Sequence, residues 1–281
     1  MSDNYMSSLY TFQPDLNAYF ARIGYNGSRE PTLETLRDVQ WCHLQTIPYE
    51  NLDVHIADKV SINPVDIQRK MIFEGRGGYC FEQNIYAMWV LRALGFNVTP
   101  VMGRTRWMKP ADIMTPLAHI ILKVKFENDL YIFDVGFFML CYPLKVNTEE
   151  EQPTALETYR IVYQSTTDSY MNQVLLAGEW KDLYVFTLTE SYPCDWDIGN
   201  FYVSKCNTFI LYNYIVVSCP QGGYRYTLVN NVLTERNVVS GEPPIDTEIK
   251  TEAEYLRVLR EVFKIKIPEG TKICPRNINW D

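Results

Sequence analysis

Cys80 stands in the segment whose composition is best suited to nucleophilic chemistry. Residues 75–84 read Gly-Arg-Gly-Gly-Tyr-Cys-Phe-Glu-Gln-Asn, so a glycine-rich run directly precedes the cysteine. Such a run permits a tight turn, and the apolar residues that follow it predict a helix beginning at about Cys80. Backbone amides and the positive end of a helix dipole stabilise a thiolate, which is the nucleophilic form of cysteine. The alternative is a glycine-rich loop before a cysteine that is simply buried.

His119 and Asp134 could supply the base and the orienting carboxylate that a cysteine nucleophile needs. Asp134 lies in an apolar, strand-like run, where a carboxylate is costly unless it is paired. We expect residues 118–126 and 130–137 to form a hairpin with a two-residue turn taken from the Glu-Asn-Asp at 127–129. In a hairpin with an even-numbered turn, the residue numbers of two opposing positions have an odd sum. Because 119 and 134 also have an odd sum, both side chains lie on one face of the sheet, offset by two or four residues. The pattern predicts a Cys-His-Asp triad of nucleophile, base and orienter.

The remaining candidate residues are expected to have structural roles. The chain has only three histidines, so a histidine-rich metal site is excluded and no metal is expected. His43 lies on the apolar stripe of a predicted helix and is expected to be structural, whereas His55 lies in a polar stretch and is expected at the surface. Arg104, Arg106 and Lys109 form either a solvated loop or a phosphate contact.

The composition indicates a folded protein of about two units. The 281 residues are 47% hydrophobic and 14% aromatic, which excludes disorder and coiled coils. With 26 Lys+Arg against 34 Asp+Glu the net charge is −8, which argues against nucleic acid or an anionic membrane surface as a partner. The seven cysteines include no C-x-x-C pair, the N-terminus lacks the regions of a signal peptide, and no long apolar run is present. These features favour a cytoplasmic protein with reduced thiols.

The apolar periodicity changes twice along the chain. The first third has helical spacing, as in the stripe Leu16, Phe20 and Ile23. The middle third is rich in β-forming residues, and the last third mixes strands, including one expected over 208–217, with a helix expected over 251–263. Helices followed by strands and then mixed elements predict an α+β fold of three small layers rather than a wound parallel sheet.

Two segments resemble the signatures of the arylamine N-acetyltransferase family. Residues 76–84 match the motif R-G-G-x-C-x-E-x-N, and residues 47–52 (Ile-Pro-Tyr-Glu-Asn-Leu) are similar to the signature I-P-F-E-N-L. The 39 residues from Cys80 to His119 and the 15 from His119 to Asp134 also match the family pattern. The resemblance implies a helical bundle over 1–95 with the cysteine, a β-barrel-like domain over 96–200 with the histidine and aspartate, and an α/β lid over 201–281. Its first two parts would form a core like that of cysteine proteases and transglutaminases.

The resemblance also implies ping-pong acetyl transfer with acetyl-CoA as co-substrate and no metal or tightly bound cofactor. Cys80 would carry the acetyl group to an arylamine, arylhydrazine or heterocyclic amine, with His119 moving the proton and Asp134 orienting the imidazole. The expected substrate contacts are Tyr79, Thr115, Phe137 and Phe138. Phe138 departs from the family, whose members commonly have glycine there, and residues 205–208 lack the family's usual proline.

Three other hypotheses remain open at this point. The protein could be a related acyltransferase or amide synthase that uses a different acyl-CoA or a biosynthetic amine. It could instead be a hydrolase of the transglutaminase or papain type, or a pocket that only binds aromatic ligands. The expected partners are small molecules, and the sequence favours no particular oligomeric state.

Overall fold

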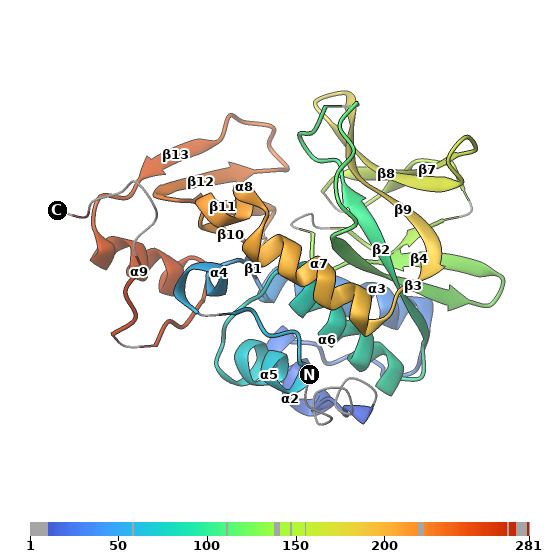
Figure 1. The fold of residues 1–281 in the computed structure, drawn as a ribbon, viewed down its shortest axis with the longest axis horizontal. Coiled ribbons are helices and arrows are strands. Elements are labelled where there is room, and N and C mark those ends of the chain that lie inside the picture. The colour runs from blue at the N-terminus through green and yellow to red at the C-terminus, as the bar shows by residue number, and fades with distance from the viewer. Residues whose placement is uncertain are drawn as a thin grey trace.

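The computed structural model shows an α+β protein made of N-terminal helices, a nearly closed antiparallel barrel and a C-terminal sheet (Figure 1). The α+β fold expected from the change in periodicity is confirmed. The structure describes residues 11–57, 59–110, 112–137, 141–146, 148–154, 156–218, 222–268, 270–273 and 280.

The N-terminal helices begin where the sequence offers capping side chains. Asp15, Thr32 and Asn63 each accept a hydrogen bond from a backbone N–H of the first helical turn. Each cap satisfies a donor that has no partner within its helix. The helices are Leu16–Ile23 (α2), Leu33–Thr46 (α3), Asp53–Ile56 (α4), Pro64–Gln68 (α5), the π-helical turn Arg69–Phe73 (η1) and Cys80–Ala93 (α6).

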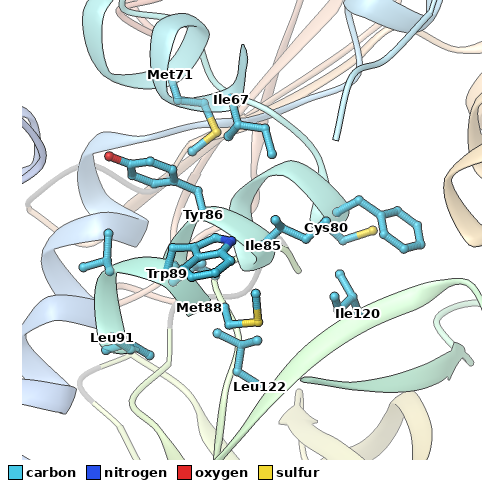
Figure 2. Close-up of a cluster of buried hydrophobic side chains, with 14 of the residues drawn as sticks. Ile67, Met71, Cys80, Ile85, Tyr86, Met88, Trp89, Leu91, Ile120 and Leu122 are labelled. Atoms are coloured by element: carbon cyan, nitrogen blue, oxygen red, sulfur yellow. The ribbon is translucent and has the colours of Figure 1, made fainter. Parts of the chain in front are cut away.

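Helix α6 is the centre of the N-terminal part. Every side chain from Cys80 to Leu91 is buried, which is typical of a helix covered on all sides. Figure 2 shows its side chains in one apolar cluster with Met71 of η1 and Leu122 of the neighbouring strand. Because the cluster surrounds the helix, the N-terminal end that carries Cys80 has little freedom to move.

The middle of the chain forms an eight-stranded antiparallel sheet in the order β5-β4-β3-β2-β9-β8-β7-β6. Strands β5 and β7 also contact each other, which nearly closes the sheet into a barrel. Aromatic and branched side chains, among them Tyr159, Ile161, Tyr184 and Phe186, fill the interior. The strands are Asn97–Thr105 (β2), His119–Phe126 (β3), Asp129–Phe133 (β4), Leu144–Lys145 (β5), Gln152–Pro153 (β6), Thr158–Gln164 (β7), Ser169–Leu176 (β8) and Glu179–Glu190 (β9).

The C-terminal part joins a second antiparallel sheet to three helices. Helix α7 crosses between the barrel and this sheet in Figure 1. The sheet has the order β1-β10-β11-β12-β13, and its first strand, Tyr49–Glu50 (β1), comes from the N-terminal part of the chain. The other elements are Pro193–Lys205 (α7), Thr208–Tyr212 (α8), Ile215–Ser218 (β10), Tyr224–Val229 (β11), Val232–Asn237 (β12), Ile245–Glu248 (β13) and Glu252–Glu261 (α9).

Two predicted strands are corrected by the structure. The strand expected over 208–217 begins as helix α8, because the Asn207 side chain accepts from the N–H groups of Phe209 and Ile210 and caps it. The strand expected over 130–137 ends at Phe133. Beyond that residue, side-chain oxygens rather than a neighbouring strand accept the backbone N–H groups.

The division at residues 95 and 200 stays a prediction, and so does the cytoplasmic location. The pairing of β1 with β10 ties the first and last thirds of the chain together. In the part of the chain that the structure describes, no helix is both long and apolar enough to cross a membrane.

Candidate active site

Cys80 is the first residue of α6 and is only 7% exposed. The glycine run before it passes close to the segment that precedes β1. A Cβ on Gly77 would come within 2.1 Å of the carbonyl oxygen of Pro48, and the carbonyl of Gly78 accepts from the Glu50 N–H at 3.0 Å. The turn therefore requires glycine for close approach, and it leads directly into the helix as the sequence predicts.

His119 and Asp134 lie on one face of the β3–β4 hairpin. The register pairs Leu122 with Phe133 and Phe126 with Asp129, which leaves a two-residue turn at 127–128. The residue numbers of every pair sum to 255, so the position opposite His119 is residue 136. Asp134 is therefore two positions away from the residue opposite His119. The imidazole Nε2 and the Asp134 Oδ2 are 2.8 Å apart, and both residues are buried. The structure thus brings together the two residues that hairpin parity placed on one face.

The electrostatics of this pair favour an imidazolium facing Cys80. Burial by itself lowers the pKa of His119, but the adjacent Asp134 carboxylate and the Cys80 side chain outweigh it and raise the pKa to about 10. Burial raises the pKa of Asp134, but the charge and hydrogen bond of His119 outweigh it, so the net shift is downward. Since Nε2 bonds to the carboxylate, Nδ1 is the ring nitrogen left for the thiol. The imidazolium thus places a positive charge beside Cys80, and a cation next to a thiol favours its nucleophilic, deprotonated form.

Asn84 fixes the Asp134 carboxylate from the α6 side. Its amide Nδ2 donates to Asp134 Oδ1 at 2.8 Å and to the carbonyl of Ile120 at 2.7 Å, while its Oδ1 accepts from the Val135 N–H at 3.0 Å. Asn84 lies four residues after Cys80, on the same helix face. The sequence reasoning assigned this residue no role of its own, although the i, i+4 spacing was visible.

Tyr184 of β9 lies beside the triad inside the barrel. Its ring centre is 5.0 Å from that of His119, and it lines a small cavity together with Asp134. Burial raises the pKa of Tyr184 well above its usual value, so the phenol stays protonated and can donate. Sequence reasoning missed Tyr184, because β9 comes next to the β3–β4 hairpin through its long-range pairing with β2.

Five charged side chains form a buried network beneath the glycine turn. Lys70 Nζ lies 2.7 Å from Glu82 Oε1 and 2.7 Å from Asp53 Oδ2, and Arg76 Nη2 lies 2.8 Å from Glu50 Oε1 and 2.7 Å from Asp53 Oδ1. The free oxygens of the two glutamates accept backbone N–H groups, Glu82 from the residue before Cys80 and Glu50 from the residue before Asp53. The network therefore joins both signature segments to the start of α6.

The other predicted site residues fall into different environments. Phe137 packs edge-on against His119 with ring centres 5.1 Å apart, next to the triad. Tyr79 is 1% exposed, and its hydroxyl donates to Asn200 of α7. Thr115 donates its hydroxyl to the carbonyl of Thr105 at 2.8 Å. Phe138 lies outside the described residues. The roles of these four residues as substrate contacts stay predictions.

The basic residues near position 105 hold the loop between β2 and β3. Arg104 donates to the carbonyl of Thr115, and Arg106 donates to the carbonyls of Pro110 and Ile113. Arg106 is buried, so it is not part of a solvated loop.

The two remaining histidines, His43 and His55, hydrogen-bond to residues outside the triad. His43 is buried between the Tyr19 hydroxyl and Gln83, in agreement with the predicted structural role. Burial lowers the pKa of His43 to about 3, so it stays neutral. His55 was expected to be an ordinary surface residue, which is wrong. It is half-buried and stacks on Tyr214 with ring centres 3.9 Å apart. No cluster of three or more potential metal ligands occurs among the described residues.

A buried thiol next to an imidazolium and its carboxylate can attack a carbonyl carbon and hold the acyl group as a thioester. This arrangement belongs to thiol enzymes that transfer or hydrolyse acyl groups.

Comparison with known proteins identifies one family within this class. A family model described as N-acetyltransferase matches residues 32–272. The chain is 31% identical over 261 residues to the arylamine N-acetyltransferase of Escherichia coli strain K12, covering 92% of this chain and 91% of that relative. The solved structure of Mycobacterium marinum arylamine N-acetyltransferase in complex with CoA superposes with a TM-score of 0.83 at 30% identity, over 89% of this chain and 93% of that one. The chain belongs to the arylamine N-acetyltransferase family, and the enzyme is an acyltransferase.

Replacing His119 is expected to change how Cys80 alkylation depends on pH. The high pKa of His119 keeps a positive charge beside Cys80 at neutral pH, so iodoacetamide should alkylate Cys80 faster in wild type than in His119→Ala. In His119→Ala the rate should be low at pH 6 and rise about tenfold per unit, as for an ordinary thiol of pKa about 8.5. His43→Gln is the control and should keep the wild-type profile. A flat profile in His119→Ala would contradict the ion pair.

Gly136→Ala is expected to disturb the site directly. The added methyl would come within 2.5 Å of Cys80 Cα and 2.7 Å of Asn84 Nδ2. A displacement near 1 Å lowers catalytic rates by about 100-fold, and we expect a loss of that order in Cys80 alkylation near neutral pH. Gly103→Ala, whose methyl approaches its nearest atom only to 3.3 Å, should lose much less. Equal rates in the two variants would show that the contact at Gly136 is unimportant.

Lys70→Met should reduce stability because it leaves Glu82 and Asp53 without their shared cation. Removing one partner of a buried charge group costs about 3–5 kcal/mol. Urea denaturation measures the free energy of unfolding. Arg69→Met is the neighbouring control, since Arg69 is 62% exposed in its ion pairs, and it should change stability by less than about 1 kcal/mol. Similar losses in both variants would argue against a structural role for the network.

Proposed function

We propose that this enzyme transfers an acetyl group from acetyl-CoA to the nitrogen of arylamines, arylhydrazines or heterocyclic amines by a ping-pong mechanism. The observation that carries the proposal is the buried Cys80–His119–Asp134 arrangement on a fold that its relatives share. The relative from Salmonella typhimurium, 32% identical over 219 residues, is described as an arylamine N-acetyltransferase and N-hydroxyarylamine O-acetyltransferase. The M. marinum structure contains CoA.

In the first half-reaction the Cys80 thiolate attacks the acetyl carbonyl of acetyl-CoA. The carbon–sulfur bond to CoA breaks, a thioester to Cys80 forms, and the His119 imidazolium gives its proton to the departing CoA thiolate. His119 is then neutral, and Asp134 keeps its ring orientation through the 2.8 Å contact to Nε2. Because one thioester replaces another, this step is nearly isoenergetic.

In the second half-reaction the amine nitrogen attacks the acetyl carbonyl on Cys80. The bond from carbon to Cys80 sulfur breaks, and His119 accepts the proton that the nitrogen loses. The thiolate–imidazolium pair is thereby restored. Amide formation from a thioester is downhill and drives the cycle. Phe137, which lies against His119, is placed to pack on the ring of an aromatic acceptor.

The burial of the site favours transfer over hydrolysis. Cys80, His119 and Asp134 are 7%, 2% and 4% exposed, so an acyl group on the sulfur would meet little water. An acyl-enzyme in such a place waits for an acceptor that binds well. This argument supports an amine acceptor over the hydrolytic alternative. Another acyl-CoA or a biosynthetic amine remains the second candidate, and a series of donors and acceptors distinguishes them.

Intact-protein mass spectrometry after mixing with acetyl-CoA alone tests the proposal. We expect one acetyl adduct that maps to Cys80 and is absent from Cys80→Ala. Cys141→Ala is the matched control, since Cys141 is also buried, and it should still acquire the adduct. An added arylamine should discharge the adduct and become acetylated, while buffer alone should discharge it slowly. A folded protein that gains no adduct, or one that water discharges as fast as the amine, would falsify the proposal.

A further inference from the structure

Helix α7 holds the residues on both sides of Cys80. It connects β9 to the C-terminal part of the chain, and two of its consecutive residues contact the start of α6. The Tyr79 hydroxyl donates to the side-chain Oδ1 of Asn200. Gly199 lies so close to Phe81 that an added Cβ would come within 2.5 Å of the end of that ring. Both chain neighbours of Cys80 are therefore held by one helix that lies far along the sequence.

Asn200 has hydrogen-bond partners on its side chain and on its backbone. Its Nδ2 donates to the carbonyl of Val60 at 3.1 Å, and its backbone carbonyl accepts from the Ser204 hydroxyl at 2.7 Å. A carbonyl only accepts, so the NH₂ group must face Val60, which leaves Oδ1 for the Tyr79 hydroxyl. Burial raises the pKa of Tyr79 well above its usual value, so the phenol stays protonated and donates. The orientation of the amide and the direction of the bond to Tyr79 are thus both fixed.

Tyr79 passes this constraint to the backbone at Cys80. Its N–H donates to Glu82 Oε2 at 3.1 Å, and its ring lies edge-on to that of Phe81 with centres 6.1 Å apart. Tyr79 is the N-cap residue of α6, so a change in its backbone moves the first helical residue, which is Cys80. Helix ends fray readily, whereas a reacting group must be held within about 0.5 Å of its productive geometry. An anchor on the N-cap side chain meets that need.

We propose that Asn200 is a positioning residue for the acyl-transfer reaction, acting through the Tyr79 hydroxyl to hold Cys80 in place beside His119. The inference rests on the proposed function for its role in acyl transfer. The positioning itself can be measured through alkylation of Cys80, which needs no acyl donor.

A double-mutant cycle with the full-length protein tests the inference. The variants are Asn200→Leu, Tyr79→Phe and their combination, and the readout is the rate at which iodoacetamide alkylates Cys80 at pH 7. In the wild-type background, Asn200→Leu should lower this rate about tenfold, because one buried hydrogen bond shifts a population by about that factor. In the Tyr79→Phe background it should lower the rate by less than about twofold, because the hydroxyl that Asn200 holds is gone.

Cys141 in the same protein distinguishes loss of positioning from loss of structure. Cys141 and Cys80 are each 7% exposed, and Cys141 lies outside α6. A variant that merely loosens the fold opens the interior more often and should make both thiols react faster. Loss of positioning should slow Cys80 alone and leave Cys141 protected. Peptide mapping by mass spectrometry gives both rates in each sample.

Ser191→Ala is the matched control for the same helix. The Ser191 hydroxyl accepts from Trp196 Nε1 at 3.0 Å, and both residues are buried, so the change also removes one buried side-chain hydrogen bond of α7. It should lower stability to urea comparably and leave the rate at Cys80 unchanged. Where Asn200→Leu fails to fold, as judged by circular dichroism, Asn200→Ala takes its place in the cycle.

The outcomes separate the positioning role from the proposed activity. A loss of rate at Cys80 that requires the Tyr79 hydroxyl, with Cys141 still protected, supports the inference whether or not acetyl-CoA proves to be the donor. An equal loss in both backgrounds, no loss in either, the same loss in Ser191→Ala, or faster alkylation of both thiols overturns it. Failure of the acetyl adduct to form in wild type, together with the expected cycle, would refute only the acyl donor.

Discussion

One buried carboxylate organises the site. Taking Asp134 out of water costs several kcal/mol unless its oxygens are hydrogen-bonded. Its partners come from different elements: Asn84 from α6 and His119 from β3, together with the N–H of Gly136. Satisfying the carboxylate therefore forces the central helix and the hairpin into one arrangement, with Cys80 at the start of that helix.

The charge network beneath the glycine turn fixes the other end of the site. Lys70 and Arg76 pair with three carboxylates, and two of these also accept backbone N–H groups. Burial raises the pKa of Glu82 to about 7 even though Lys70 opposes this shift, so the network is costly to bury. Breaking it is more costly, because the remaining charges would lie in a low-dielectric interior. Three of its residues, Glu50, Arg76 and Glu82, fall in the two segments that carry the family signatures, whereas Asp53 and Lys70 lie outside them. The signature segments therefore contain both the candidate nucleophile and part of the charge network that supports it.

The prediction from sequence was strongest where the pattern was local. The helix at Cys80 follows from a glycine turn and apolar residues, and the shared face of His119 and Asp134 follows from hairpin parity. The prediction failed at Asn207. The segment after it is rich in β-forming residues and was predicted as a strand, but the Asn207 side chain caps a helix there. It also failed at Asp134, where the strand ends because side chains accept the N–H groups of the next residues. His55 was assigned to the surface because its neighbours in the chain are polar, whereas it packs on a residue 159 positions away.

The sequence by itself determined which residues are the candidate nucleophile, base and carboxylate, because each lies in a segment whose short-range pattern indicates its local structure. The tertiary structure alone decided which other side chains complete the site. Tyr184 and Asn172 lie near Asp134 only because β9 pairs with β2 and β8 pairs with β9. The charge network joins residues from 50 to 82 only when the glycine turn packs on β1. Short-range spacing determines helix faces and hairpin registers, but contacts between strands that are far apart in the sequence depend on long-range pairing, which no local pattern encodes.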